Sequence, residues 1–221
     1  MHRTIIAICT VALLAPALLL ASPSGLNNIP TADYTQAGQL VLQAYGTLAS
    51  GADNSLFLGA KFGLGNGIEV GADRLMAPSP DGPLAFQVKK TWSMPVIPLK
   101  LCAGLANITD ATGDHPLYPY GVASYHLPGA SRAHLGIALP EDNHQLLAGF
   151  DYTLGDGTML RTDLVRGFTG GNQMTLYSLG ALVPKKFGAV EGWITRGIDS
   201  APGGGNSTAL TLKVDFSLKL F

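Results

Sequence analysis

Few side chains in this sequence are placed to do chemistry. His126 and His134 flank the connection 127–133, and Ser124 lies two residues before His126. A serine hydroxyl becomes a useful nucleophile only beside a base, and the base needs an orienting carboxylate or amide. No orienting group of that kind is evident from the sequence. Polar residues at a water interface are therefore the favoured interpretation, and no catalytic residue is assigned.

Metal, cofactor and nucleic-acid sites also lack support. His126 and His134 have no third ligand at a metal-binding spacing, so neither a metal nor a cofactor is predicted. Cys102 is the single cysteine outside the apolar N-terminal run, which excludes an internal disulfide once that run is removed. The 15 acidic and 14 basic residues nearly balance, with no cluster of Lys and Arg, which argues against nucleic-acid binding.

The first 21 residues have the layout of a secretory signal peptide. His2 and Arg3 precede an apolar run at 5–20, and small residues follow it. Cleavage after Ala21 or after Ser24 fits this pattern. An uncleaved N-terminal anchor is the alternative.

From about Gln39 onward, apolar residues recur at every second position, which is the period of β-strands. Gly, Asn, Asp and Pro interrupt the pattern at intervals that are typical of turns. The candidate strands lie near 39–46, 55–64, 68–74, 84–91, 96–108, 118–126, 132–139, 144–154, 158–165, 173–183, 188–196 and 207–221.

Two hairpins show the alternation most clearly. Three-residue turns at 65–67 and 155–157 keep all apolar side chains of each hairpin on one face, with Gly157 in the left-handed conformation. The predicted facing pairs are Phe62 with Val70, Leu64 with Ile68, Tyr152 with Leu160, and Asp151 with Arg161.

Composition indicates which solvent the apolar face meets. Charged residues make up 13% of the chain, about half of the share usual in soluble domains, whereas 47% are hydrophobic. A soluble barrel needs a charged exterior, but here the polar face is rich in Gly, Ser and Thr and carries few charges, of both signs, which suits a lumen. The residues expected to line the lumen are Lys61, Glu69, Asp73, Lys89, Lys100, Arg132, Asp151, Arg161, Asp163, Lys213 and Asp215. The residues expected to face lipid are Leu58, Phe62, Val70, Phe150, Tyr152, Leu160, Leu212 and Phe216.

Connection lengths indicate how such a barrel is oriented. Connections after even-numbered strands are short, such as 155–157, whereas those after odd-numbered strands are mostly longer, such as 109–117. Membrane barrels have short periplasmic turns and longer external loops, so both termini are expected in the periplasm. The predicted fold is all-β, an antiparallel up-and-down transmembrane β-barrel of about 12 strands at 39–221, preceded by a signal helix at 1–21 and an N-terminal periplasmic segment at 22–38.

The chain resembles small, porin-like bacterial outer-membrane β-barrel proteins over its whole mature region, from the signal peptide to a last strand that stops at Phe221. Residues 24–33 are similar to the start of a group of uncharacterised bacterial barrels, which implies no activity. The resemblance implies outer-membrane lipid as the surroundings and the barrel-assembly machinery as a partner of the C-terminal strand. One departure is that Lys219, Ser217 and Asp215 share the parity of Phe221, so the apolar stripe is displaced by one residue from the terminal aromatic.

Three functions fit this architecture. The leading hypothesis is a monomer in the bacterial outer membrane that acts as a narrow passive channel or as a structural envelope protein, with any selectivity set by the lumen residues. The second is a barrel-borne hydrolase acting on lipid or cell-wall material. The third is a secreted soluble β-barrel that binds an apolar ligand.

Overall fold

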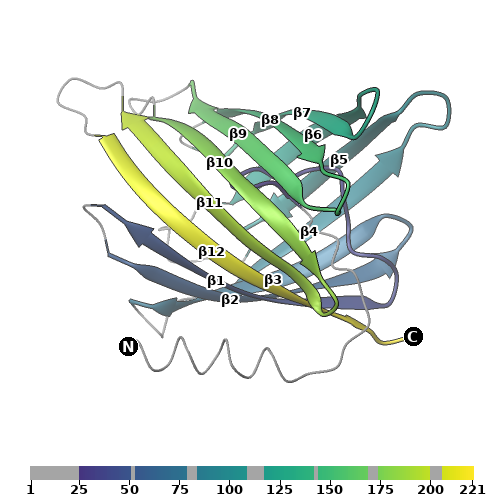
Figure 1. Ribbon diagram of the computed structural model, residues 1–221, viewed down its shortest axis with the longest axis horizontal. Coiled ribbons are helices and arrows are strands. Elements are labelled where there is room, and N and C mark those ends of the chain that lie inside the picture. Colours follow the sequence, from purple (N-terminus) through teal and green to yellow (C-terminus); the bar gives the residue numbers. More distant parts are fainter. Residues whose placement is uncertain are drawn as a thin grey trace.

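The alternating segments form a single antiparallel sheet that closes on itself. The computed structural model describes residues 25–50, 53–78, 84–108, 117–141, 144–168, 174–199 and 206–221. Each strand pairs with its neighbours in sequence, and β1 pairs with β12 to close the barrel (Figure 1). The strands are β1 (Gln39–Ala49), β2 (Ser55–Gly65), β3 (Ile68–Ala77), β4 (Leu84–Ser93), β5 (Leu99–Ala106), β6 (Tyr118–His126), β7 (Ser131–Ala138), β8 (Gln145–Thr153), β9 (Met159–Gly167), β10 (Met174–Lys185), β11 (Gly188–Asp199) and β12 (Asn206–Lys219). The predicted all-β fold, an up-and-down barrel of twelve strands, is confirmed.

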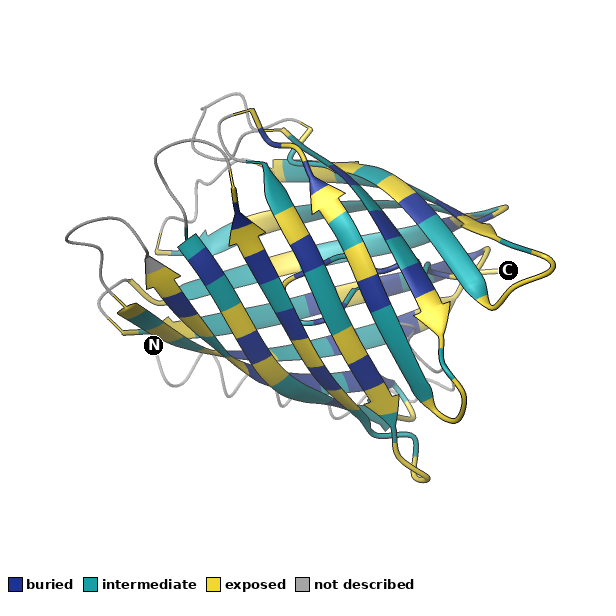
Figure 2. Cartoon of the chain, turned by 90° about the horizontal axis from the view of Figure 1, so that it is seen from above, coloured by how far each residue is buried: buried dark blue, intermediate teal, exposed yellow. Residues whose placement is uncertain are grey.

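Burial alternates along the strands with the period of the sequence pattern (Figure 2). In β8, Leu147 and Asp151 are fully buried, whereas Leu146 and Phe150 are exposed. Successive side chains of a strand point to opposite faces, so one face of the closed sheet lines the interior and the other forms the outer surface. The outer surface carries large apolar side chains, as a barrel surrounded by lipid requires.

The two predicted hairpins have different outcomes. The turn at 155–157 has Gly157 at φ +84°, and Tyr152 pairs with Leu160 as predicted. In the other hairpin Phe62 pairs with Val70 as predicted, but Leu64 does not pair with Ile68. Gly65 pairs with Ile68 instead.

The cause of this difference is the Asn66-Gly67 pair. Both residues have positive φ, 52° and 76°, and a two-residue turn of this kind matches the twist of the flanking strands better than a three-residue turn does. The register then shifts between Gly63 and Gly65, which leaves Leu64 as an unpaired residue on the outer surface. Because Leu64 has no partner, Gly63 still pairs with Glu69 and Phe62 with Val70.

The C-terminal residues continue past the end of β12. The Leu220 backbone N–H donates a hydrogen bond to the carbonyl oxygen of Gly38 at 2.8 Å. Phe221 is exposed and lies edge-on to Phe62, with ring centroids 6.3 Å apart. Phe221 therefore lies beyond Lys219, the last paired residue of β12, so the alternation of that strand does not determine the face on which its ring lies.

The predicted signal helix at 1–21 lies outside the described residues. Within the described parts of the chain, no helix is long and apolar enough to cross a membrane.

The turn between β2 and β3 allows a test of the fold. We expect Gly67→Ala to lower the free energy of unfolding by roughly 1–3 kcal/mol, because a Cβ there meets the Thr91 carbonyl oxygen at 2.3 Å and the backbone has positive φ. Urea unfolding in detergent, followed by tryptophan fluorescence, measures this change. Gly155→Ala is the matched control, since a Cβ at that turn position has no neighbour within 4 Å. Equal stabilities of the two variants would contradict the turn geometry.

Candidate functional site: the plugged barrel interior

Residues 25–38, which precede β1, lie inside the barrel. Their hydrogen-bond partners are on strands around the whole ring, including β3, β6, β7, β9 and β10. A short segment can contact so many strands of a closed barrel only from within it. Figure 1 shows this segment, in purple, running between the two sides of the wall. We call residues 25–38 the inner segment.

From the sequence we expected residues 22–38 to form a periplasmic segment distinct from the barrel domain. In the structure, the described part of that range lies inside the barrel and is enclosed by its wall, and Thr31, Ala32 and Thr35 have no exposed surface. The inner segment is therefore part of the packed interior. The periplasmic location expected for residues 22–38 stays a prediction.

The first part of the inner segment is fixed to β9 and β10. The Asn28 backbone N–H donates to Asp163 Oδ2 at 2.8 Å, and its side-chain amide donates to Asp163 Oδ1 at 3.1 Å. The Asn27 side chain donates to the Ser178 hydroxyl at 2.8 Å. Leu26 and Ile29 pack into an apolar cluster that includes Leu147. Polar and apolar contacts therefore hold this part in one orientation.

A glycine on the inner wall makes the apolar contact possible. A Cβ at Gly149 would lie 2.4 Å from Leu26 Cδ1 and 2.9 Å from Ile29 Cδ1. The absence of a side chain there lets both residues approach the backbone of β8.

The centre of the inner segment carries an ion-pair network. Arg132 donates through Nη1 to both carboxylate oxygens of Asp33, at 2.8 and 2.7 Å, and through Nε to Asp151 at 2.9 and 3.1 Å. Lys100 Nζ lies 3.9 Å from Asp33. Burial alone would raise the pKa of Asp33, but Arg132 and then Lys100 lower it below its usual value. Asp33 is therefore a carboxylate at neutral pH, and one arginine joins it to the wall.

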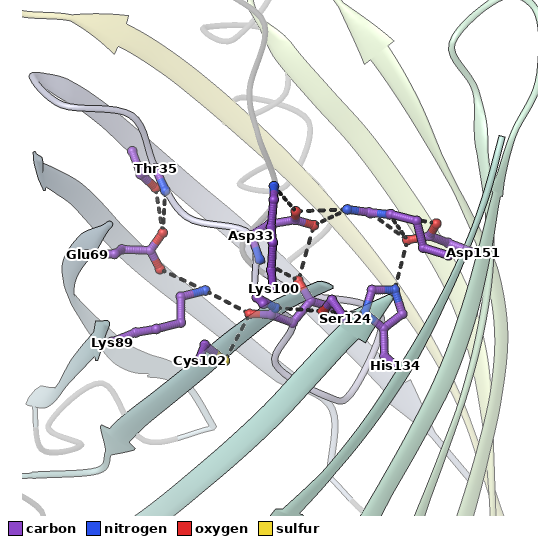
Figure 3. Close-up of polar contacts among 12 residues, drawn as sticks. Asp33, Thr35, Glu69, Lys89, Lys100, Cys102, Ser124, His134 and Asp151 are labelled. Atoms are coloured by element: carbon purple, nitrogen blue, oxygen red, sulfur yellow. Dashed lines mark hydrogen bonds and ion pairs between the residues drawn. The ribbon is translucent and has the colours of Figure 1, made fainter. Parts of the chain in front are cut away.

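Ser124, His134 and Asp151 form a connected row beneath the inner segment (Figure 3). Ser124 Oγ is 2.8 Å from His134 Nδ1, and His134 Nε2 is 3.3 Å from Asp151 Oδ2. This connectivity matches a nucleophile, a base and an orienting carboxylate. However, Ser124 is 1% exposed, and its hydroxyl accepts a hydrogen bond from the Ala32 backbone N–H at 3.0 Å. In this state the row anchors the inner segment.

The sequence relates His134 to His126 across the connection 127–133 and indicates no carboxylate partner, whereas in the structure His134 lies next to Asp151. The two residues lie far apart in sequence and meet because β7 and β8 place Arg132 opposite Asp151 and His134 opposite Gly149. Among the described residues, no group of three or more His, Cys, Asp and Glu side chains is arranged to hold a metal ion.

The last part of the inner segment is held by Glu69. Its Oε2 accepts hydrogen bonds from the Thr35 backbone N–H and hydroxyl, at 2.7 and 2.8 Å. The other oxygen of Glu69 lies 3.7 Å from Lys89 Nζ, and Lys89 donates to the Thr31 carbonyl oxygen at 3.4 Å. Cys102 Sγ is also 3.4 Å from that oxygen. Figure 3 shows these contacts beside the central network.

A second charged cluster lies on β9, β11 and β12. Arg161 donates to Glu191 at 2.8 Å, and Lys213 lies 2.9 Å from Glu191 and 3.1 Å from Asp215. Gln43 on β1 donates to Asp215 at 2.9 Å. The wall therefore neutralises its own charges here, without the inner segment.

Lys61 and Asp73 are half-buried and line the same interior cavity. Of the residues expected to face lipid, Leu58, Phe150, Tyr152, Leu160 and Leu212 are exposed, and Phe62, Val70 and Phe216 are half-buried.

Next to the inner segment the barrel retains a cavity of about 270 Å³. Residues 25–30 form one wall, and side chains of β1–β6, β11 and β12 form the rest. The pattern of inward side chains was visible in the sequence, but the segment that divides the lumen was missed. Alternation does not extend into residues 25–38, and the only available indication was the similarity of residues 24–33 to the start of other barrels.

Cys102 allows a test of how the inner segment is held. In protein prepared without residues 1–21 it is the single thiol, and it is 4% exposed beneath Thr31. We expect Arg132→Met to raise the rate at which a small thiosulfonate reagent labels Cys102 by at least about tenfold, because the change leaves two buried carboxylates without their main partner.

Arg166→Met is the control for this labelling experiment, because Arg166 is exposed on the outer face of β9. Its labelling rate should equal that of the unmodified protein. Equal rates for Arg132→Met and Arg166→Met would show that Arg132 does not hold the inner segment.

Comparison with known proteins supports the fold assignment. No family model matches the chain, and no curated protein matches its sequence. Among solved structures, the KdgM porin in complex with disordered oligogalacturonate superposes with a TM-score of 0.60 at 12% identity, covering 80% of this chain and 99% of the porin. A second KdgM porin structure gives a TM-score of 0.58 at 11% identity, with the same coverage. The chain therefore has the fold of these porins, a closed antiparallel β-barrel, here with twelve strands.

Proposed function

We propose that the protein is a narrow channel of the bacterial outer membrane, with its bore restricted by its own inner segment. The observation that carries this proposal is that residues 25–38 cross the interior while a cavity of about 270 Å³ remains beside them. A bore divided in this way admits small polar solutes and excludes larger ones. The charged side chains along the remaining space would set the selectivity.

The proposed location follows from the outer surface and the N-terminal sequence. Large apolar side chains cover the outside of the barrel, so lipid is the solvent that suits it. We further propose export through a cleaved signal peptide at 1–21, recognition of β12 by the barrel-assembly machinery, and a monomeric state.

The similarity to the KdgM porin supports a channel. That protein is a porin, and its structure was determined in complex with disordered oligogalacturonate. The two proteins share their architecture, with a TM-score of 0.60 at 12% identity.

A hydrolase is the second candidate, favoured by the row of Ser124, His134 and Asp151. For this activity the inner segment would have to leave Ser124. Hydrolysis of a chromogenic acyl ester that is abolished in Ser124→Ala would support the hydrolase. Absence of turnover, together with ion conductance, would support the channel.

The channel is tested by conductance across a planar bilayer. We expect the refolded protein to conduct weakly and a variant lacking residues 25–34 to have a unitary conductance several-fold higher, because the deletion removes the segment that fills the bore. Arg132→Met is a second variant, and it keeps the full chain. Because it removes the arginine that joins Asp33 to the wall, it should show openings of the higher conductance more often than the unmodified protein. Absence of conductance in all three proteins, each shown to be folded by heat-dependent electrophoretic mobility, would overturn the channel.

The lining charges are tested by ion selectivity. We expect Lys61→Glu to shift the reversal potential in a salt gradient toward cation preference, because Lys61 lines the remaining cavity. Lys186→Glu has the same charge change at an exposed position after β10, so it serves as the control. An identical shift in both variants would indicate that Lys61 does not line the conducting path.

A further inference from the structure

The cavity beside the inner segment has a fixed and partly closed shape. Its wall of residues 25–30 is held by the hydrogen bonds of Asn27 and Asn28 and by the packing of Leu26 and Ile29. On the other side, Tyr118 is the first residue of β6, whereas Tyr45 and Asp73 lie near the middle of β1 and β3. The cavity is therefore preformed and lies around the middle of the barrel, with the inner segment as one wall.

The charges around this cavity balance. Lys89 is paired with Glu69, and Lys213 is paired with Glu191 and Asp215. The lining itself has three lysines and two carboxylates, and Glu191, Asp215 and Arg161 lie behind Lys213 without lining the cavity. Counted together, the lining and these ion-pair partners make four cations and four carboxylates. A site for an anion or a cation would present an excess of the opposite charge. A balanced set instead offers hydrogen-bond donors and acceptors side by side, which suits hydroxyl groups that need both.

Aromatic rings and amides complete the lining. Tyr45, Tyr118, Tyr120 and Trp193 border the cavity, and Gln43 and Gln87 add side-chain amides. Tyr45 is held in place by stacking on Phe57, with ring centroids 4.8 Å apart. Aromatic rings give flat apolar surfaces with a polar group at the edge, which match the C–H face and the hydroxyl rim of a sugar ring.

The volume limits the size of the ligand. Small-molecule sites typically enclose about 300–1,000 Å³, so a cavity of about 270 Å³ fits a ligand at the small end of this range. We propose that the cavity is a binding site for a small neutral sugar on its way through the channel. This inference rests on the proposed channel function and adds the class of solute.

The test uses Trp193 as a reporter of binding. The chain has two tryptophans, and Trp92 is exposed on the outer surface, so Trp92→Phe leaves a single tryptophan at the cavity. Glucose, glucuronate and glucosamine are added in turn to the folded protein in detergent. These probes share one ring and differ in charge. We expect a saturable change in fluorescence with glucose. The affinity for each of the two charged sugars should be lower than that for glucose by a factor of about ten or more.

Variants separate binding at the cavity from binding elsewhere. Tyr45→Leu in the Trp92→Phe background should weaken glucose binding about tenfold. Tyr177→Leu is the control, because Tyr177 is exposed on the outer face of β10, and it should leave binding unchanged. Calorimetric titration of the unmodified chain with glucose gives the same answer without any substitution.

The outcomes separate this inference from the proposed function. No saturable response to glucose, or equal or tighter binding of glucuronate or glucosamine, would overturn the neutral-sugar site even if the protein conducts ions. Equal loss of binding in Tyr45→Leu and Tyr177→Leu would overturn its location. Glucose binding in a folded protein that conducts no ions would support the site and overturn the channel.

Discussion

A charged side chain inside a narrow barrel must have a partner, because removing an ion from water without compensation costs several kcal/mol. This requirement organises the whole interior. On β9, β11 and β12 the wall supplies its own partners, as in the contacts of Lys213 with Glu191 and Asp215. Elsewhere the inner segment supplies them: Asp33 shares Arg132 with Asp151, and Thr35 donates to Glu69. The inner segment is thus held by the same charges that, without it, would face an open lumen.

The barrel was predictable because strand formation on a two-faced wall leaves a strong period in the sequence. All twelve strands appear where alternation placed them, and the pairing of Asp151 with Arg161 follows from keeping apolar residues on one face. The error at Leu64 has a local cause, since the preference of Asn66-Gly67 for a two-residue turn outweighed a simple count of positions. The face and the register of a strand are indicated by many alternating residues at once, so a single exception does little harm. The type of a turn depends on only two residues.

The interior was less predictable because its contacts join residues that no period relates. The Ser124, His134 and Asp151 row spans three strands, and Ala32, which covers it, precedes all of them. Inward direction could be inferred for each wall residue separately, but the identity of its partner could not. The glycines of the inner wall mark places where the inner segment approaches closely, but the sequence does not say which residues approach. At Gly149, for example, Leu26 and Ile29 occupy the space that a side chain would need.

The seam between β1 and β12 has a consequence for the order of assembly. It runs through eleven residue pairs, from Gln39 with Lys219 to Ala49 with Ala209, and the inner segment is joined directly to the start of β1. Once those pairs have formed, residues 25–38 could enter only by threading through the end of a completed cylinder. Docking of the segment before the last strand closes avoids that step. In that order of events the wall would form around a core that is already present.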